Sequence, residues 1–490
     1  MNIVDPILYQ CRRQPPAAAI CVPGAATRLI SYRRLERAIH NATRRLHASG
    51  LPPGSVMAIG VKDLVLHIVV MLAAMRLGMI TVSLPEREGS LAVSADALVC
   101  DSKQPFVMGI SRIVLADETW LESDGEPLAA HLLPNVGEDD PCRLILTSGT
   151  SSTPKAVAFS HDMVGRRMAR HVTFGNLIAN FSRIYCDLPV SSSLGFQFLI
   201  HTLWRGGMVA FAGDDFPSTL RAIQDYNVQC MLGSPGGFEN FLRWVEATPN
   251  YQSDIELIVS AGDALSAPLL QRLRSRICSH LLSIYGSTEA SMTAIANAHE
   301  IADVPQAVGY VTPGVTVQII DEAETLLPLG EEGQLRIRSE FAVDGYFRNP
   351  EESAKVFRQG WFYPGDQGTL NAEGLLVIKG RQHAVLNLGG DKASAESIEL
   401  VLTQLPGVLE AAAVAVPNVN GVNEVWAVVV AGEQIDEPTL RAYCETRLSH
   451  QFAPVKYLFA KSLPHNENGK LDRRRVLEQI AAPSAPSAQS

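Results

Sequence analysis

The chain has 490 residues, of which 47% are hydrophobic and 19% are charged, and its formal net charge is -10 at pH 7. Because this length exceeds what one hydrophobic core usually supports, we expect at least two domains. The acidic balance argues against a nucleic-acid partner, which would need a concentrated basic face, and the hydrophobic content argues against extended disorder.

The cysteines and the N-terminal residues predict a reducing, cytoplasmic location. The eight cysteines are scattered along the chain without a Cys-x-x-Cys pair or the spacing of a zinc site. The first residues, MNIVDPILYQCRRQPP, lack the basic start and apolar core of a secretory signal. The longest apolar run, residues 64–80, is interrupted by polar residues and is too short to cross a bilayer, so no membrane span is expected.

The first half of the chain alternates between strand and helix patterns. Residues 55–61 and 79–84 are apolar and β-rich, and residues 64–78 between them carry apolar side chains at helical spacing. The alternation recurs at residues 229–248 and 255–277, and another strand is predicted at residues 280–286. This pattern predicts layered α/β architecture, with ligands at the carboxyl ends of the strands.

The second half of the chain changes in texture. Residues 308–379 show short strands and turns, residues 394–461 predict the order helix, strand, strand, helix, strand, and the last residues, AAPSAPSAQS, are low in complexity. We expect an α/β fold with a large, multi-layer N-terminal domain over residues 1–381, including a small β-barrel-like subdomain. A small, mobile α+β domain follows over residues 382–478, and a disordered tail covers residues 479–490.

A hydroxyl-rich loop follows a predicted strand at residues 147–155, TSGTSSTPK. Glycine allows close backbone approach, and backbone amides with several hydroxyls can surround phosphate oxygens. It is not a Walker loop, since Pro154 and Ala156 flank Lys155 where that motif has glycine and a hydroxyl residue. Taken alone, the loop is equally consistent with an ordinary polar surface loop.

Four further positions offer groups that suit a nucleotide. YGSTE at residues 285–289 supplies a ring, a hydroxyl and a carboxylate. Asp366 lies in a Gly-flanked turn, Arg381 follows it, and Lys470 lies in NENGKLDRR. Each has a simpler interpretation, respectively a strand-end turn, a turn aspartate, a surface arginine and a solvated lysine.

Together these segments resemble the adenylate-forming superfamily of acyl- and aryl-CoA ligases, peptide-synthetase adenylation domains and luciferases. The loop is similar to the signature S/T-S/T-G-T-x-G-x-P-K, and YGSTE, YPGD, GRQH and NENGKLDRR are similar to Y-G-x-T-E, aromatic-x-G-D, G-R-x-D and P-x-x-x-x-G-K-x-x-R. GEEGQL and GYFRNP resemble two further family segments, and the resemblance extends to about residue 478.

The resemblance implies a role for each matching position. The loop from Thr147 to Lys155 would surround the β- and γ-phosphates, and Thr150 and Glu289 would hold Mg²⁺. The nucleoside and α-phosphate contacts would come from Tyr285 at adenine, Thr288 at the α-phosphate, and Asp366 and Arg381 at the ribose. Lys470 would bridge the α-phosphate and the substrate carboxylate. The remaining ATP-binding positions implied are Ser148, Gly149, Ser151, Gly262, Asp263, Ala264, Gly286 and Ser287.

The resemblance also implies a second half-reaction with a thiol. The small domain would rotate about a hinge at His383, where the family usually has Asp or Lys, and Gly389 and Gly390 would line a pantetheine tunnel. Other departures from the family pattern are Ser152, Ala156, Ala395, Ser397 and the Ser191-Ser192 pair, which stands where relatives often carry an aromatic residue and histidine. None of them removes a charge from the phosphate site.

Substrate and acceptor remain open at the level of sequence. Positions expected near the acid, around Ser192, Phe196, Gly262 and Gly286, are small or apolar, which favours an aromatic or medium-sized aliphatic acid over an amino acid. LNLGGDKASAESIE favours CoA as acceptor, with ATP and Mg²⁺ as cofactors. The alternatives are loading of a phosphopantetheinyl carrier protein and a non-catalytic nucleotide-binding relative. A homodimer is common in the family, but no residue decides it.

Overall fold

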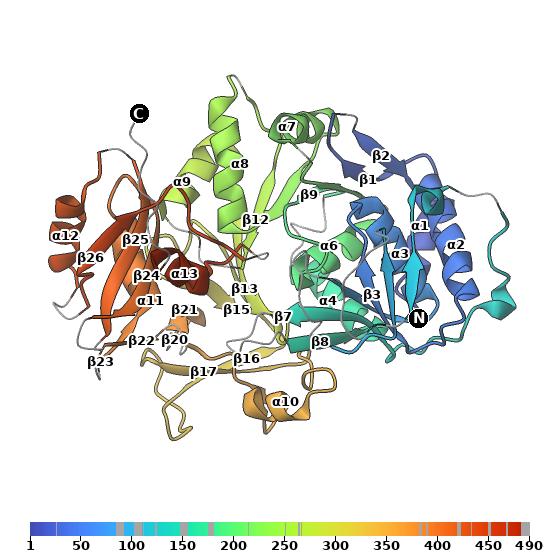
Figure 1. Cartoon of the computed structure of the whole chain (residues 1–490). Coiled ribbons are helices and arrows are strands. Elements are labelled where there is room, and N and C mark those ends of the chain that lie inside the picture. The colour runs from blue at the N-terminus through green and yellow to red at the C-terminus, as the bar shows by residue number, and fades with distance from the viewer. Residues whose placement is uncertain are drawn as a thin grey trace.

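The computed structural model describes most of the chain. The residues described are 1–25, 27–84, 93–101, 110, 112–122, 125–147, 155–174, 181–213, 215–249, 251–262, 265, 267–381, 385–388, 391–418, 423–432, 434–448, 452–466 and 469–481. It shows the expected α/β fold, with a large N-terminal part and a small C-terminal part at one side of it (Figure 1).

A six-stranded sheet forms one layer of the N-terminal part, with strand order β6-β5-β3-β4-β7-β8. Its strands are β3 (Val56–Gly60), β4 (Ile80–Ser83), β5 (Ala97–Cys100), β6 (Ile113–Leu115), β7 (Pro141–Thr147) and β8 (Lys155–Ser160). The associated helices are α1 (Asp5–Arg13), α2 (Tyr32–Ala48), α3 (Leu64–Arg76) and α4 (His161–Phe174), with short 3-10 turns η1 (Glu118–Leu121) and η2 (Ala130–Leu132). The predicted strand–helix–strand unit at residues 55–84 is thus confirmed as β3, α3 and β4.

A second, larger sheet crosses the molecule, and its first half is parallel. Strands β9 to β13 pair in parallel, in the order β10-β9-β11-β12-β13. They are β9 (Arg183–Cys186), β10 (Met208–Phe211), β11 (Cys230–Gly233), β12 (Leu257–Ala261) and β13 (Leu281–Ser287), extended at one edge by β1 (Ala18–Val22) and β2 (Arg28–Ser31). The helices are α6 (Ser193–Trp204), α7 (Phe216–Asp225), α8 (Pro235–Ala247) and α9 (Ala267–Arg276).

The other half of this sheet is antiparallel and corresponds to the short-strand segment predicted at residues 308–379. It continues from β13 in the order β14-β15-β21-β20-β17-β19-β18, with β16 paired to β17. The elements are β14 (Ser291–Asn297), β15 (Ala307–Val311), β16 (Val315–Ile320), β17 (Gly333–Ser339), β18 (Phe357–Arg358), β19 (Trp361–Phe362), β20 (Asp366–Leu370) and β21 (Leu375–Arg381), with helix α10 (Pro350–Val356).

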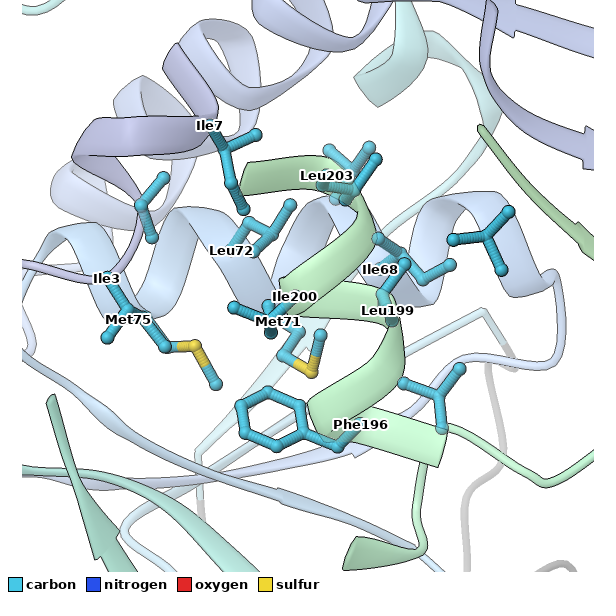
Figure 2. Close-up of a cluster of buried hydrophobic side chains, with 14 of the residues drawn as sticks. Ile3, Ile7, Ile68, Met71, Leu72, Met75, Phe196, Leu199, Ile200 and Leu203 are labelled. Atoms are coloured by element: carbon cyan, nitrogen blue, oxygen red, sulfur yellow. The ribbon is translucent and has the colours of Figure 1, made fainter. Parts of the chain in front are cut away.

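The core between the two sheets is built around α3 and α6. Helix α3 carries apolar residues on all sides, which suits a helix whose faces all pack against other parts of the chain. Asp63 caps its N-terminus by accepting from the Leu66 amide. Figure 2 shows Phe196, Leu199, Ile200 and Leu203 of α6 packing on α1 and α3. A second core lies under α7, α8 and α9.

The C-terminal part folds around its own small sheet, in the order β24-β25-β26. Its elements are α11 (Ala395–Thr403), β24 (Val408–Pro417), β25 (Asn423–Ala431), α12 (Glu437–Glu445), β26 (Lys456–Phe459) and α13 (Arg473–Ala481), preceded by the hairpin of β22 (Val385–Leu388) and β23 (Asp391–Ser394). The order predicted for residues 394–461 is confirmed. Apolar clusters cover both faces of this sheet. No helix among the residues listed above combines the length and hydropathy needed to cross a membrane.

Candidate active site

Two residues predicted to hold the nucleoside meet although 81 positions separate them. Tyr285 lies near the end of β13, and Asp366 is the first residue of β20. The Tyr285 hydroxyl donates to Asp366 Oδ2 at 2.5 Å, and Asp366 is only 4% exposed. Asp366 is also paired across the β20–β21 ladder with Arg381, so the antiparallel register brings the predicted ribose residues side by side.

The turn that follows β13 carries the predicted Mg²⁺ ligand Glu289. The Ala290 amide donates to Ser287 Oγ at 3.0 Å, which closes the turn, and Glu289 is nearly buried. The hydroxyl of Tyr346 donates to Glu289 Oε1 at 3.1 Å. A buried carboxylate with one fixed donor leaves oxygen lone pairs for a hard cation, so the residue fits the metal that accompanies ATP.

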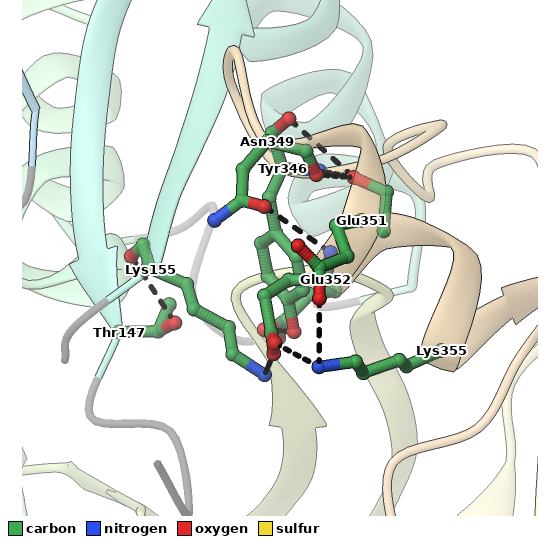
Figure 3. A network of polar contacts seen from close by, with 9 residues as sticks. Thr147, Lys155, Tyr346, Asn349, Glu351, Glu352 and Lys355 are labelled. Atoms are coloured by element: carbon green, nitrogen blue, oxygen red, sulfur yellow. Dashed lines mark hydrogen bonds and ion pairs between the residues drawn. The ribbon is translucent and has the colours of Figure 1, made fainter. Parts of the chain in front are cut away.

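The strand ends that flank the hydroxyl-rich loop are held together. Thr147 and Lys155 are paired across β7 and β8, and Thr147 Oγ1 donates to the Lys155 carbonyl at 3.3 Å. Figure 3 shows Lys155 reaching Glu352, with its Nζ 2.7 Å from Glu352 Oε2 and 5.1 Å from the centre of the Tyr346 ring. The hydrogen bond from Lys155, with a second from Lys355, lowers the pKa of Glu352 to about 2. A lysine, an aromatic ring and the Glu289 carboxylate therefore adjoin at the base of this loop.

Lys470 lies in a tight turn of the C-terminal part that contacts the N-terminal part. Its amide donates to Asn466 Oδ1 at 3.0 Å, and the Asn466 amide donates to its carbonyl at 2.8 Å. Gly469 has φ +72°, and a Cβ on it would lie 2.3 Å from Oγ of Ser234, the residue that caps α8. Glycine is therefore required twice here, by its dihedral angle and by its close approach. The turn is docked beside the carboxyl end of β11.

The parallel strands explain why these groups converge. Strands β11, β12 and β13 end side by side: Ser234 directly follows β11, Gly262 directly follows β12, and β13 ends at Gly286-Ser287. Carboxyl ends of parallel strands share one edge of a sheet, which is where α/β proteins bind ligands. Gly262 has φ +99°, a backbone conformation that favours glycine at this edge.

The two residues predicted to contact the acid are engaged in local structure. Ser192 caps α6, since its Oγ accepts from the Gly195 amide at 3.1 Å and donates to the Pro189 carbonyl at 2.8 Å. Phe196 is fully buried in the core between the sheets. Their roles toward a substrate stay predictions.

Several predicted positions lie outside the described residues. These are the loop residues Ser148, Gly149, Thr150 and Ser151, the strand-end residues Asp263 and Ala264, the hinge His383, and Gly389 and Gly390. Among the residues that are described, no group of three or more His, Cys, Asp and Glu side chains is placed to hold a metal ion. A single carboxylate together with substrate phosphates is a usual way to bind Mg²⁺, so Glu289 alone is compatible with it.

Two buried arginines were missed by the sequence analysis. Arg143 on β7 donates from Nη2 to Ser83 Oγ at 2.6 Å and to the Val190 carbonyl at 3.2 Å, beside Phe196. Arg167 on α4 donates to the carbonyls of the turn that carries Glu289. Their only signal in the sequence is a positive charge inside an otherwise apolar strand or helix face, and such charges are usually solvated.

Comparison with known proteins agrees with this geometry. The model of the AMP-binding enzyme family matches residues 8–347, and that of the AMP-binding enzyme C-terminal domain matches residues 397–470. The chain belongs to the AMP-binding enzyme family. This agrees with the adenylate-forming enzymes that the motifs resemble, and the family is one of AMP-forming ligases.

Curated relatives cover nearly the whole chain. A 4-chlorobenzoate–CoA ligase from Arthrobacter is 26% identical over 98% of this chain and 95% of its own length. A fatty acid–[acyl-carrier-protein] ligase, ScoC from Streptomyces coeruleorubidus, is 25% identical over 99% and 97%. The crystal structure of ATP-bound MatB from Rhodopseudomonas palustris has a TM-score of 0.81 and 24% identity, and covers 98% of this chain and 99% of that one. This likeness shows that the folds agree.

Proposed function

We propose that the chain is an AMP-forming acid–thiol ligase that uses ATP to activate an aromatic or medium-sized aliphatic carboxylic acid and transfers the acyl group to CoA. One observation carries the proposal. The Tyr285–Asp366 pair, Glu289 with Lys155, and the Lys470 turn come from distant parts of the chain and gather at one edge of the large sheet. The relative that acts on 4-chlorobenzoate supports CoA as the acceptor.

The first half-reaction joins two anions. A carboxylate oxygen of the acid attacks the α-phosphorus of ATP, the bond to the β-phosphate bridging oxygen breaks, and pyrophosphate leaves. No general base is needed because the acid is already ionised, so the residues supply charge and position. Lys470 holds the attacking carboxylate against the α-phosphate, Thr288 contacts that phosphate, and Tyr285 and Asp366 fix the nucleoside.

Residues around the triphosphate complete the charge balance. Lys155 lies at the base of the loop that would surround the β- and γ-phosphates, and Glu289 and Thr150 would hold Mg²⁺. The metal, when bound with ATP, supplies positive charge to the departing pyrophosphate. In the second half-reaction a thiolate attacks the acyl carbon and AMP leaves with its phosphate oxygen. For this step we propose rotation about His383 and a pantetheine path beside Gly389 and Gly390.

A carrier protein is the second candidate acceptor. The likeness to the ligase ScoC favours it, since that relative is named for an acyl-carrier protein. A phosphopantetheine arm presents the same thiol as CoA, so the two functions share the adenylation site and differ only in what docks beside it.

We also propose that the chain works in the cytoplasm. All eight cysteines are buried and none of them forms a disulfide in the structure, and burial raises the thiol pKa of most of them, for example to about 12 for Cys11. Buried neutral thiols without disulfides suit a reducing compartment.

The test is pyrophosphate exchange into ATP across a panel of benzoates, cinnamates, fatty acids and amino acids. We expect an aromatic or medium-chain acid to stimulate exchange, and a complete lack of stimulation by every acid would refute the ligase function. Competition between CoA and a phosphopantetheinylated carrier protein then identifies the acceptor. Acyl transfer to the carrier alone would remove CoA from the proposal.

A further inference from the structure

Arg167 forms a fork under the turn that carries the predicted metal ligand. It lies in α4, a few residues after the strand that begins with Lys155, and its side chain is fully buried. Nη1 donates to the Thr288 carbonyl at 3.0 Å, and Nη2 donates to the Glu289 carbonyl at 3.2 Å. Nε and Nη2 both donate to the Phe341 carbonyl, at 3.0 and 2.7 Å.

The environment of this guanidinium is unusual for a purely structural residue. Its hydrogen-bond acceptors are three neutral carbonyls, and its carbon Cζ lies 4.5 Å from the centre of the Phe159 ring. Burial lowers the pKa of Arg167 to about 9, while the negative charge of Glu289 opposes that shift. A buried charge whose hydrogen-bond acceptors are all neutral costs stability, and an apolar side chain would join two elements at a lower cost.

The two carbonyls belong to the residues that the proposed function places at the α-phosphate and at Mg²⁺. Fixing consecutive carbonyls fixes the peptide planes of the turn, and with them the direction in which the Thr288 and Glu289 side chains leave the backbone. Tyr346 fixes the Glu289 carboxylate from the other end. The turn is thus restrained both at its backbone carbonyls and at the carboxylate of Glu289.

We propose that Arg167 is a positioning residue for metal–nucleotide binding, holding the Thr288–Glu289 turn in the orientation that Mg²⁺ and the phosphates require. This inference rests on the proposed function, because it concerns the residues through which ATP would be bound. It adds to that function a residue that contacts neither ATP nor metal and acts through Glu289.

Helix α4 offers a matched control. Arg170 lies one turn further along, is also buried, and its Cζ lies 4.4 Å from the centre of the Phe341 ring. It donates to Thr312 Oγ1 and to the Pro313 carbonyl, and neither of these residues belongs to the Thr288–Glu289 turn. Replacing it removes a buried cation of the same kind from the same helix.

The experiment compares Arg167→Met with Arg170→Met. Affinity for Mn²⁺ in the presence of ATP is measured by electron paramagnetic resonance, and the Mg²⁺ dependence of pyrophosphate exchange is measured in parallel with thermal unfolding. We expect both variants to unfold at lower temperature. Only Arg167→Met should weaken metal binding, by about ten-fold or more, as loss of a residue that orients a metal ligand usually does.

Equal changes in metal affinity in the two variants would overturn the positioning role, and so would an unchanged affinity in Arg167→Met. If Arg167→Met does not fold, Arg167→Lys replaces it, because a single ammonium cannot span three carbonyls and should still weaken Mn²⁺ binding. An unchanged affinity in folded Arg167→Lys then overturns the inference. Failure of every acid to stimulate exchange would instead refute the ligase function, and Mn²⁺ binding with ATP still decides the role of Arg167.

Discussion

The nucleoside end and the acid end of the candidate site are built differently. At the nucleoside end, Tyr285 and Asp366 bond to one another across a long sequence separation. At the acid end, Ser192 bonds to residues three positions away and Phe196 is enclosed in the core. The first pair joins two strands that are distant in the sequence, whereas the second pair helps to form a helix and a core.

This difference separates what the family shares from what a single member varies. Because adenylate-forming enzymes all use ATP, we expect the residues that bind it to keep recognisable motifs. The acid differs between members, and the segment that would contact it doubles as the start of α6. Variants at the two ends should therefore separate effects on catalysis from effects on stability.

Lys470→Ala tests the charge that the C-terminal part brings to the nucleotide. Removing one preorganised charge typically costs about 10² to 10³ in rate, so acid-dependent pyrophosphate exchange should fall by that factor. Thermal unfolding should change little, because the turn is held by the Asn466 side chain and by backbone hydrogen bonds of Asn466 and Gly469, which the substitution leaves in place. The exposed Lys461→Ala serves as the control, and equal exchange in both variants would contradict the role of Lys470.

Asp366→Ala tests the nucleoside end directly. A hydrogen bond to a charged group contributes about 1.5 to 3 kcal/mol, so the KM for ATP should rise by roughly ten- to a hundred-fold, while the KM for the acid stays close to its original value. Glu373→Ala, in the exposed turn of the same hairpin, should have no effect on either constant. A rise in the acid KM alone would place Asp366 at the wrong end of the site.

The buried layer below the acid end should respond to pH. His67 bonds through Nε2 to Ser83 Oγ, which Arg143 also contacts, and burial together with the Arg143 charge lowers the His67 pKa to about 4. An unfolded histidine takes up its proton near pH 6.5, whereas folded His67 stays neutral until the pH approaches 4. The contribution of neutral His67 to the free energy of unfolding is therefore fully present above pH 6.5 and is lost as the pH falls towards 4.

We expect about 2 kcal/mol of the free energy of unfolding to be lost through His67 between pH 7.5 and pH 5. Urea unfolding of the wild type and of His67→Gln at both pH values measures this loss. The drop in the free energy of unfolding from pH 7.5 to pH 5 should be smaller in His67→Gln by that amount. Exposed His47→Gln should leave the dependence unchanged. A curve for His67→Gln that parallels the wild type would show that the fold does not lower the pKa of His67.

Ser192→Ala tests whether the Ser192 hydroxyl at the acid end stabilises helix α6 or contacts the substrate. Loss of the N-cap of α6 should lower the free energy of unfolding by about 1 kcal/mol, measured by urea unfolding beside Ser191→Ala. We expect the KM for ATP to stay the same. An unchanged free energy of unfolding with a raised KM for the acid would instead assign the Ser192 hydroxyl to substrate contact. The acid end would then resemble the nucleoside end, in that its polar group serves binding and not the local fold.

Local sequence patterns were sufficient to predict many helices and strands, but not to predict which strands pair with one another. The β3–α3–β4 unit and the element order of the C-terminal part follow from periodicity and turn residues. Two-residue strands such as β18 and β19 lack any such signal. The joining of parallel and antiparallel strands into one sheet depends on pairings between distant segments, which periodicity does not encode.

The same limit applies to the site. Charged and aromatic residues in motifs were predicted because their types match the chemistry of ATP, and the structure brings Tyr285, Asp366 and Glu289 to one sheet edge. Arg143 and Arg167 were missed, since a buried arginine looks like a surface one until its neighbours are known. The hydrogen-bond partners of Arg167 are backbone carbonyls, and a carbonyl carries no signature in the sequence. Arg143 bonds to a carbonyl and to hydroxyls of residues that are far away in the sequence.

The unbroken hydrogen-bonded ladder from β13 through β14, β15 and β21 to β20 has a consequence for how ATP is received. Tyr285 and Asp366 lie in the same sheet, so the spacing between the proposed base contact and the proposed sugar contact is set before any ligand arrives. Adenosine would meet a surface that needs no ordering, which spares binding an entropic cost at that end. AMP keeps the same base and sugar and would therefore be bound in the same way. Release of AMP, and not binding of ATP, would then be the step that a change of domain arrangement must assist.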